Sequence, residues 1–234
     1  MAAIPIRWGL GKLAERAAAA AAAAAAANAA KDVVKDTPGV RAREAECADA
    51  QDASDCNECQ LANGRVGQPP TPRYLTARTR INYDYQLQIA NMHADPERFG
   101  YVRRGDGSDT IVNIDLETAK SFFGRGGEYT TLEWLYAGIS FDGFWGSRCT
   151  VVEAKANFGS FFNEYGDPAK PFTPIIVGGW VAGYIEQLAI IQPTSPRGRL
   201  EWHFMDVAAY EAALAAGIPA TSAFHTPYLL GRFP

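Results

Sequence analysis

The chain has 234 residues and a formal net charge of -4, and 47% of its residues are hydrophobic and 12% aromatic. This length and composition allow a sizeable buried core, which indicates a soluble globular protein of one domain with an appendage. The charge excludes a strongly basic protein of the kind that binds nucleic acid through its overall field, although it does not decide against DNA by itself.

The first part of the chain shows neither a signal peptide nor a membrane segment. The start "MAAIPIRWGLGKLAER" lacks a basic region followed by a leucine-rich core, and we find no run of about 18 or more strongly apolar residues. We therefore expect no membrane insertion. If the protein leaves the cell, we expect a route that does not read such a signal.

Composition divides the chain into three parts. Residues 1–36 are rich in alanine and are predicted to form a helical linker, because alanine has the highest helix propensity and the segment has no strong apolar stripe. Residues 37–72 form a polar, cysteine-containing lead-in. The prolines of "GQPPTPRY" end this lead-in, and we place the folded domain at residues 73–234.

The four cysteines leave three alternatives open. Cys56 and Cys59 form a C-x-x-C pair, Cys47 precedes them closely, and Cys149 is far away in the sequence. This pattern is compatible with a structural zinc site at Cys56 and Cys59, with disulfides, or with free thiols.

The remaining elements alternate between helices and strands. We predict helices over residues 76–92, 175–192 and 207–218 and strands over residues 139–145, 150–156 and 199–206. This order predicts an α/β fold with a mixed central sheet flanked by helices.

Three charged residues stand out within the two apolar strands at residues 139–156. Only four residues separate these strands, so they should form an antiparallel hairpin in which Glu153 and Lys155 share one face and Asp142 reaches the same region. Two neighbouring carboxylates suit Mg²⁺, and the lysine can polarise water or offset charge on a phosphate. The alternative is a salt bridge on a solvent-facing sheet.

Five sequence words, in this order, resemble the toxin family Tox-REase-5 of the PD-(D/E)xK restriction-endonuclease superfamily. They are "YQLQIAN", "LEWLYAGISFDGFW", "VVEAKANF", "EQLAIIQ" and "LEWHF". The family occurs at the C-termini of bacterial polymorphic toxins and type VI secretion effectors. The resemblance implies a restriction-endonuclease-like fold and a Mg²⁺-dependent or Mn²⁺-dependent nuclease that hydrolyses phosphodiester bonds of DNA.

The resemblance also implies roles for the charged residues. Asp142 and Glu153 would be metal ligands, the backbone carbonyl of Ala154 would be a possible third ligand, and Lys155 would position the attacking water.

Five further residues fall at family positions. Glu133 would add a carboxylate, with a structural ion pair as the alternative. Gln86 or Gln88 stands where many relatives carry an acid on the first helix, and Gln187 or Gln192 stands where relatives carry an active-site glutamine.

The family implies a biological setting as well. We expect a type VI secretion effector that is delivered without a signal peptide into the cytoplasm of a competing bacterium. Its expected partners are DNA as substrate, a cognate immunity protein in the producer, and the secretion apparatus or an upstream delivery protein. An inactive domain of the same fold, serving in binding or structure, is the alternative. A phosphatase or peptidase on another fold has no supporting G-x-S-x-G, H-E-x-x-H or Walker motif.

Overall fold

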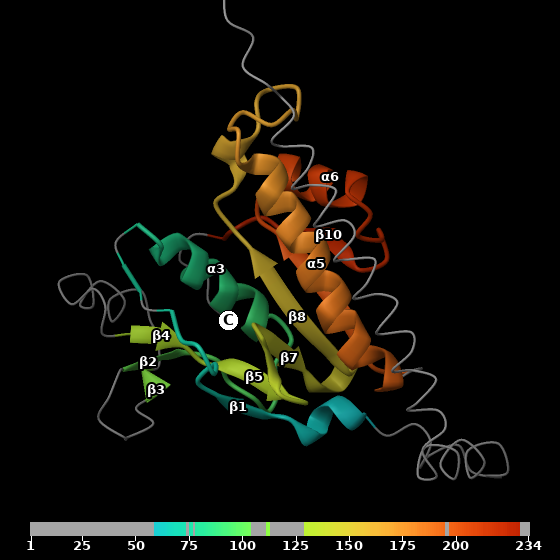
Figure 1. The fold of residues 1–234 in the computed structure, drawn as a ribbon. Helices are drawn as coiled ribbons and strands as arrows, with labels where there is room; N and C mark the ends of the chain where they lie inside the picture. Colours follow the sequence, from blue (N-terminus) through green and yellow to red (C-terminus); the bar gives the residue numbers. More distant parts are fainter. Residues whose placement is uncertain are drawn as a thin grey trace, which may run out of the picture.

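A computed structural model of the chain describes residues 59–73, 75–76, 78–103, 111–112, 129–194 and 197–229. Within these ranges the fold is a mixed α/β arrangement of sheets and helices (Figure 1). The predicted helical linker at residues 1–36 lies outside the described residues, as do Cys47 and Cys56.

The central sheet contains four strands, which span Gly143–Trp145 (β7), Thr150–Lys155 (β8), Arg199–Phe204 (β9) and Ala223–His225 (β10). Their order is β10-β9-β8-β7. β7 and β8 are antiparallel, whereas β8 and β9 as well as β9 and β10 are parallel, so the sheet is mixed as predicted. The sequence analysis did not find β10.

The stretch predicted as one strand over residues 139–145 bends at Asp142, which separates β6 (Ile139–Phe141) from β7. β6 belongs to a second sheet of order β1-β5-β6, whose other strands are Arg65–Gly67 (β1) and Glu133–Tyr136 (β5). Asp142 therefore lies at the junction between the second sheet and the central sheet.

The predicted hairpin between β7 and β8 is confirmed. Gly143 pairs with Val152, so the next position along the ladder brings Asp142 opposite Glu153. Because side chains two residues apart lie on the same face of a strand, Lys155 follows Glu153 on that face. The hairpin thus brings together the three residues that the sequence singled out.

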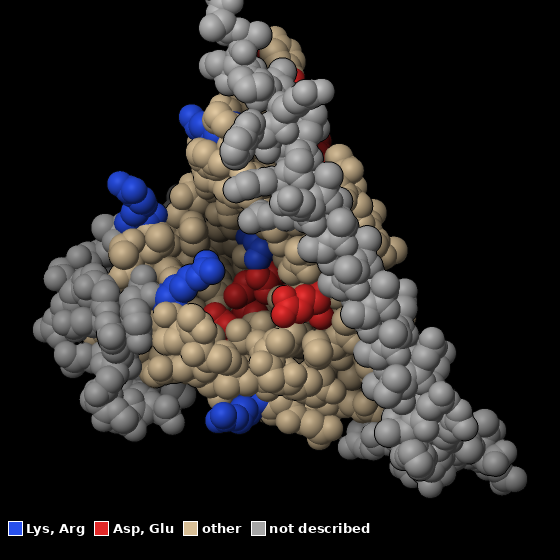
Figure 2. Space-filling model, viewed as in Figure 1, with Lys and Arg blue, Asp and Glu red and all other residues tan. Residues whose placement is uncertain are grey.

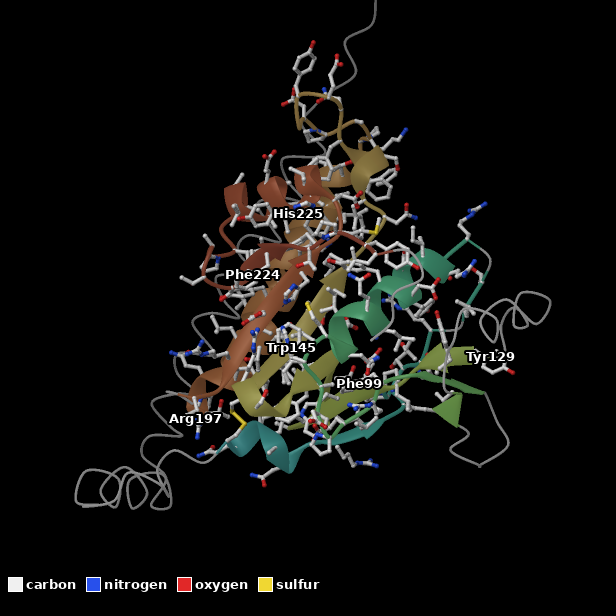
Figure 3. The ribbon with its side chains drawn as sticks, turned by 180° about the vertical axis from the view of Figure 1, so that it is seen from behind. Phe99, Tyr129, Trp145, Arg197, Phe224 and His225 are labelled. Carbon is white, nitrogen blue, oxygen red and sulfur yellow. A yellow bond between two sulfur atoms is a disulfide. The ribbon has the colours of Figure 1, made fainter. Side chains whose placement is uncertain are left out.

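Part of the lead-in belongs to the fold. β1 pairs antiparallel with β5, so the folded unit begins before the boundary predicted at residue 73. Cys59 forms a disulfide with Cys149, 90 residues away at the start of β8, and Figure 3 draws disulfides in yellow. A cysteine binds zinc as a free thiolate, and Cys59 is not free because it is in a disulfide. The predicted zinc alternative at Cys56 and Cys59 is therefore wrong with respect to Cys59.

A third, antiparallel sheet of order β3-β2-β4 contains Tyr101–Arg103 (β2), Ile111–Val112 (β3) and Tyr129–Thr131 (β4). The hydroxyl of Tyr101 donates to Oδ1 of the buried Asp84 at 2.8 Å. Because Asp84 lies in the helix described next, this bond ties the third sheet to it.

Helix α3 (Arg80–Asn91) covers one face of the central sheet. A Cβ atom at Gly143 would lie 2.6 Å from the Cα atom of Ala90, so only glycine permits this close packing. The indole Nε1 of Trp145 donates to the carbonyl oxygens of Ile89 and Ala90, both at 3.1 Å. These contacts fix α3 against β7.

Helices α5 (Thr173–Ile191) and α6 (Val207–Ala215) lie on the opposite face. Gly143 packs against α3 and pairs with Val152, so Val152 lies on the α3 face of the sheet. Trp202 pairs with Glu153, which lies on the other face, so Trp202 points away from α3. Its ring contacts Tyr184 of α5 edge-on, with the ring centroids 6.1 Å apart. The sheet is therefore sandwiched between helices (Figure 1).

The helix boundaries differ from the predicted ones by a few residues. The helix predicted over residues 76–92 begins at Arg80, because Thr76 and Thr79 bond to each other in a turn that precedes it. The helix predicted over residues 207–218 ends at Ala215.

The segment Thr173–Thr194, which contains α5, is long and apolar enough to cross a membrane by length and composition, with a mean hydropathy of 1.5. The sequence analysis overlooked this run. Within the described residues only 17% of its most apolar window is buried. Because core helices of soluble proteins pass the same test, the expected absence of membrane insertion stays a prediction.

Candidate active site

Most of the predicted site residues line one cleft, which has a volume of about 610 Å³. Residues from α3, β5 and β8 line it, along with Asp142 and the segment that contains Pro69 and Arg73. Figure 2 shows acidic side chains within the hollow and basic side chains beside them. The three predicted acids Glu133, Asp142 and Glu153 all line this cleft.

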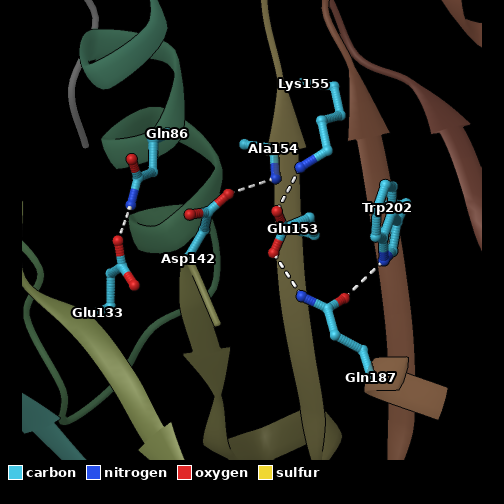
Figure 4. A network of polar contacts seen from close by, with 8 residues as sticks. All are labelled: Gln86, Glu133, Asp142, Glu153, Ala154, Lys155, Gln187 and Trp202. Carbon is cyan, nitrogen blue, oxygen red and sulfur yellow. Dashed lines mark hydrogen bonds and ion pairs between the residues drawn. The ribbon is translucent and has the colours of Figure 1, made fainter. Parts of the chain in front are cut away.

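Asp142 lies between the two sheets and is packed among protein atoms, although solvent reaches it through the cleft. Its Oδ2 atom accepts the backbone N–H of Ala154 at 2.6 Å (Figure 4). Burial raises the pKa of Asp142 well above its ordinary value, and the charges of Glu153 and Glu133 raise it further. Lys155 and the Ala154 N–H act in the opposite direction but do not cancel this effect.

Glu153 and Lys155 form an ion pair through Oε1 and Nζ at the end of β8. The other carboxylate oxygen, Oε2, accepts from Nε2 of Gln187 at 2.7 Å. Both side chains keep a small exposed fraction, 16% for Glu153 and 18% for Lys155, so a ligand in the cleft can reach them. The ion pair of the alternative interpretation is thus present, but it lies in a cleft and not on an open sheet surface.

The structure distinguishes between the two candidate glutamines that follow the hairpin. Gln187 is buried in α5, lines the cleft, and accepts the indole N–H of Trp202 at its Oε1 atom at 2.8 Å. Gln192 is exposed in the 3-10 turn after α5 and does not line the cleft. Of the two candidates, Gln187 is therefore the one that lies at the cleft, and Gln192 lies more than one helical turn beyond it; a catalytic role for either stays a prediction.

Glu133 and Gln86 form the opposite side of the cleft. Nε2 of Gln86 donates to Oε1 of Glu133 at 3.4 Å, a long bond. Burial raises the pKa of Glu133, a hydrogen bond from Ser140 lowers it, and the charge of Glu153 raises it. Glu133 therefore takes part in the same electrostatic cluster as Glu153.

Gln88 does not reach the cleft. Its Nε2 atom donates to the carbonyl of Pro227 at 2.9 Å, and its Oε1 atom accepts the N–H of Leu229 at 2.7 Å. Of the two glutamines on the first helix, Gln86 is the one in the site, and Gln88 holds the segment that follows β10 against α3.

Two cleft residues, Tyr83 and Arg73, were missed by the sequence analysis. The hydroxyl of Tyr83 donates to the backbone carbonyl of Arg73 at 2.9 Å, and both residues line the cleft. Burial raises the pKa of Tyr83, and the charge of Arg73 lowers it. Tyr83 precedes Gln86 by three residues, so the helical period could have placed it on the same face.

The acids suit a hard divalent cation. Among the described residues, no group of three or more His, Cys, Asp and Glu side chains is arranged to hold a metal ion. Mg²⁺ needs only one or two protein carboxylates, because it keeps several waters. Asp142 and Glu153 meet this requirement, and the mutual repulsion that raises the pKa of Asp142 is what a cation would relieve. The predicted carbonyl ligand at Ala154 stays a prediction.

A family model matches the part of the chain that contains Asp142, Glu153 and Lys155. The model of the family described as restriction endonuclease fold toxin 5 matches residues 122–207, which include β7, β8, α5 and β9, and this confirms the resemblance found in the sequence. The comparison with curated proteins finds no match.

Proposed function

We propose that this protein is a metal-dependent nuclease that hydrolyses phosphodiester bonds of DNA. The proposal starts from the match to the family of restriction endonuclease fold toxins. One observation carries the proposal: Asp142, Glu153 and Lys155 all lie within the residues that the family model matches, and all three line the same cleft. Carboxylates and a lysine in a cleft are the groups that metal-assisted phosphodiester hydrolysis uses.

The acids are the groups that would hold Mg²⁺ or Mn²⁺. Asp142 and Glu153 would bind the ion directly, and Glu133 adds a third negative charge on the other side of the cleft. The bound ion would supply Lewis-acid polarisation of the phosphate and neutralise part of its charge. Because burial disfavours the ionised form of Asp142, this side chain holds either a proton or a share of a cation.

Lys155 is the group that acts on water and phosphate. Its ammonium is held at the cleft by Glu153, and it can donate a hydrogen bond to an attacking water molecule. The same positive charge stabilises the negative charge that grows on the phosphate oxygens as the bond to water forms. Gln187 keeps Glu153 oriented by donating to Oε2, which in turn fixes the ion pair with Lys155.

The cleft lining suits a nucleic-acid backbone. Arg73 contributes a positive charge, and Thr71, Thr79 and Asn82 contribute hydroxyl and amide groups. Side chains of these types make most phosphate and sugar contacts in protein–DNA complexes, and such contacts carry no direct sequence information. The substrate contact proposed here is therefore mainly with the backbone.

The same proposal covers the biological role. A toxin family with a nuclease fold supports an antibacterial effector of a type VI secretion system, which acts in the cytoplasm of a competing cell. The producer then needs a cognate immunity protein, most simply an acidic one that covers the cleft. Expression without that protein should kill a naive bacterium, and Lys155→Ala should restore growth.

An inactive binding domain of the same fold is the second candidate. One observation favours it: both carboxylate oxygens of Glu153 already have partners, Lys155 and Gln187, as in a purely structural network. Such a domain would bind DNA or a protein without cutting it.

Plasmid degradation decides between the two candidates. The parent chain should cut DNA with Mg²⁺ or Mn²⁺ and not with EDTA, and Ca²⁺ should bind without supporting cleavage because its looser shell positions water poorly. Lys155→Ala should be inactive, whereas Lys170→Ala, which removes an exposed lysine away from the cleft, should cut at the parent rate. Absence of cleavage under all metal conditions would contradict nuclease activity.

A further inference from the structure

We propose that Trp202 is a positioning residue for the site, which holds Glu153 through Gln187 and Lys155 through its ring face. The inference rests on the proposed nuclease function for its effect on rate, but its structural content can be measured without activity. It concerns a residue in β9 that lies behind the cleft and not among the residues that line it.

The register of the central sheet places Trp202 beside both site residues. β8 and β9 are parallel, and Trp202 is the pairing partner of Glu153. Paired residues in neighbouring strands present their side chains on the same face, and Lys155 lies two residues further along that face. The indole therefore lies next to both members of the ion pair (Figure 4).

The indole N–H orients Glu153 through one intermediate. Nε1 of Trp202 donates to Oε1 of Gln187 at 2.8 Å, and Nε2 of Gln187 donates to Oε2 of Glu153 at 2.7 Å. Because an indole can only donate, it must meet the amide oxygen of Gln187, and this fixes which end of the amide faces Glu153. Without the indole, the amide loses one of the two bonds that fix it, and it holds Glu153 less firmly.

The indole ring also attracts Lys155. Nζ of Lys155 lies 4.5 Å from the centroid of the Trp202 ring, within the range of a cation–π contact. Lys155 thus has two partners, the Glu153 carboxylate and the ring. A ligand that draws the carboxylate away from Lys155 leaves the ammonium with the ring, still beside the cleft.

Trp202 is itself held firmly enough to act as a reference point. Its exposed fraction is 2%, and it packs against Tyr184 and Phe204. Gly183 of α5 lies over the ring, and a Cβ atom there would be 3.4 Å from the outer ring carbon. The helix therefore closes on the indole and leaves it little room to turn.

The test compares Trp202→Phe with Trp134→Phe. The first variant keeps an aromatic ring but loses the donor to Gln187. The second loses an equally buried indole donor, which bonds to the carbonyl of Leu61 at 3.1 Å away from the cleft. We expect Trp202→Phe to lower kcat for plasmid cleavage at least about tenfold with little change in KM, and Trp134→Phe to keep the parent kcat.

A second measurement does not depend on activity. In metal-free protein at one fixed neutral pH, the ¹³C chemical shift of the Glu153 side-chain carboxyl carbon should differ between Trp202→Phe and the parent, and should be the same in Trp134→Phe and the parent, because only Trp202 is joined to Glu153 through Gln187. Gln187→Met breaks the same chain of bonds, so the double variant Trp202→Phe/Gln187→Met should show much less than the sum of the two separate changes in chemical shift.

These results separate the inference from the proposed function. If the parent does not cut DNA, the nuclease proposal fails, and the chemical shift alone still tests Trp202. A Glu153 carboxyl chemical shift that is identical in the parent and in folded Trp202→Phe would overturn the inference. It would also be overturned if Trp134→Phe changed kcat and the chemical shift as much as Trp202→Phe does.

Discussion

The two sides of the cleft differ in how their polar groups are satisfied. On the side formed by β8, β9 and α5, short contacts join a continuous series of side chains: Lys155, Glu153, Gln187 and Trp202. On the side formed by α3 and β5, Glu133 has a long bond from Gln86 and a hydrogen bond from Ser140, and burial still raises its pKa. Asp142 lies between them, and burial, together with the charges of Glu153 and Glu133, raises its pKa well above the ordinary value.

This difference separates two tasks. The β8 side holds its charged groups in place before any ligand arrives, because each has a partner with defined geometry. On the α3 side, burial disfavours the ionised carboxylates, so each of these negative charges needs a proton or a nearby cation to neutralise it. We therefore expect substitutions on the β8 side to affect rate, and substitutions at Asp142 and Glu133 to affect pH dependence and cation binding as well.

The largest effect should come from the β8 side. Lys155→Ala should lower the rate of DNA cleavage at least about 100-fold, because it removes the positive charge that stabilises the phosphate in the transition state. The protein should stay folded but melt at a lower temperature, because Glu153 loses its ion-pair partner beside two other acids. Cleavage within a few-fold of the parent rate would show that the ordered side of the cleft is structural only.

Reduction of the disulfide tests whether the two sides of the cleft need a covalent link to stay in place. Cys59 precedes β1, which pairs with the Glu133 strand, and Cys149 precedes β8, so the bond joins the two sides. In a chain with Cys47 and Cys56 replaced by serine, reduction should lower the free energy of unfolding by about 2–4 kcal/mol. Urea denaturation with and without reductant measures this. An unchanged midpoint would mean that β1 pairing alone holds the sides together.

Asp142→Asn should separate stability from activity. The variant should be inactive but, without metal at neutral pH, more stable than the parent by on the order of 1 kcal/mol, because a buried charge with a raised pKa is removed. Asp167→Asn, at an exposed site away from the cleft, is the matched control and should change neither property. An Asp142→Asn protein that melts below the parent would identify the carboxylate as a structural partner.

The pH dependence of stability follows from the same shift. The pKa of Asp142 is raised in the folded state, so its contribution favours folding fully below the ordinary value of 3.8 and is lost as pH rises through the raised pKa. Metal-free protein should therefore lose stability from this group between about pH 4 and the raised value, and Mg²⁺ should restore it at the upper end. Thermal melts across this range, with Asp142→Asn as the flatter reference, measure the effect.

The smallest effect should come from Gln86→Ala. A long hydrogen bond contributes about 0.5 kcal/mol, so cleavage should fall only about twofold while the pKa of Glu133 rises slightly, because one group that favours its ionised form is lost. A loss as large as that of Lys155→Ala would show that the α3 side is ordered during catalysis after all.

Local sequence patterns account for what could be predicted. The alternation of side chains over β7 and β8 identified Asp142, Glu153 and Lys155 as neighbours, because both strands lie within one hairpin. The same helical period that buries Trp180 and Tyr184 also buries Gln187, so it could have excluded Gln192.

Contacts between distant segments account for what could not be predicted. The addition of β1 to β5, the pairing of Cys59 with Cys149, and the bend at Asp142 each depend on how two sheets meet. The alternation of side chains along a single strand does not reveal how two sheets pack against each other. The role proposed for Trp202 likewise depends on the register between β8 and β9, which are joined through a long crossover.

The disulfide also determines how force travels through the molecule. A pull on the chain before Cys59 passes directly into Cys149 and the strand that carries Glu153 and Lys155, and bypasses the chain between the two cysteines. The oxidised chain cannot be drawn out as a single extended strand, because this loop stays closed even when every other contact is lost. Any pore or unfolding motor that accepts only one extended strand can pass the loop between Cys59 and Cys149 only after the bond has been reduced.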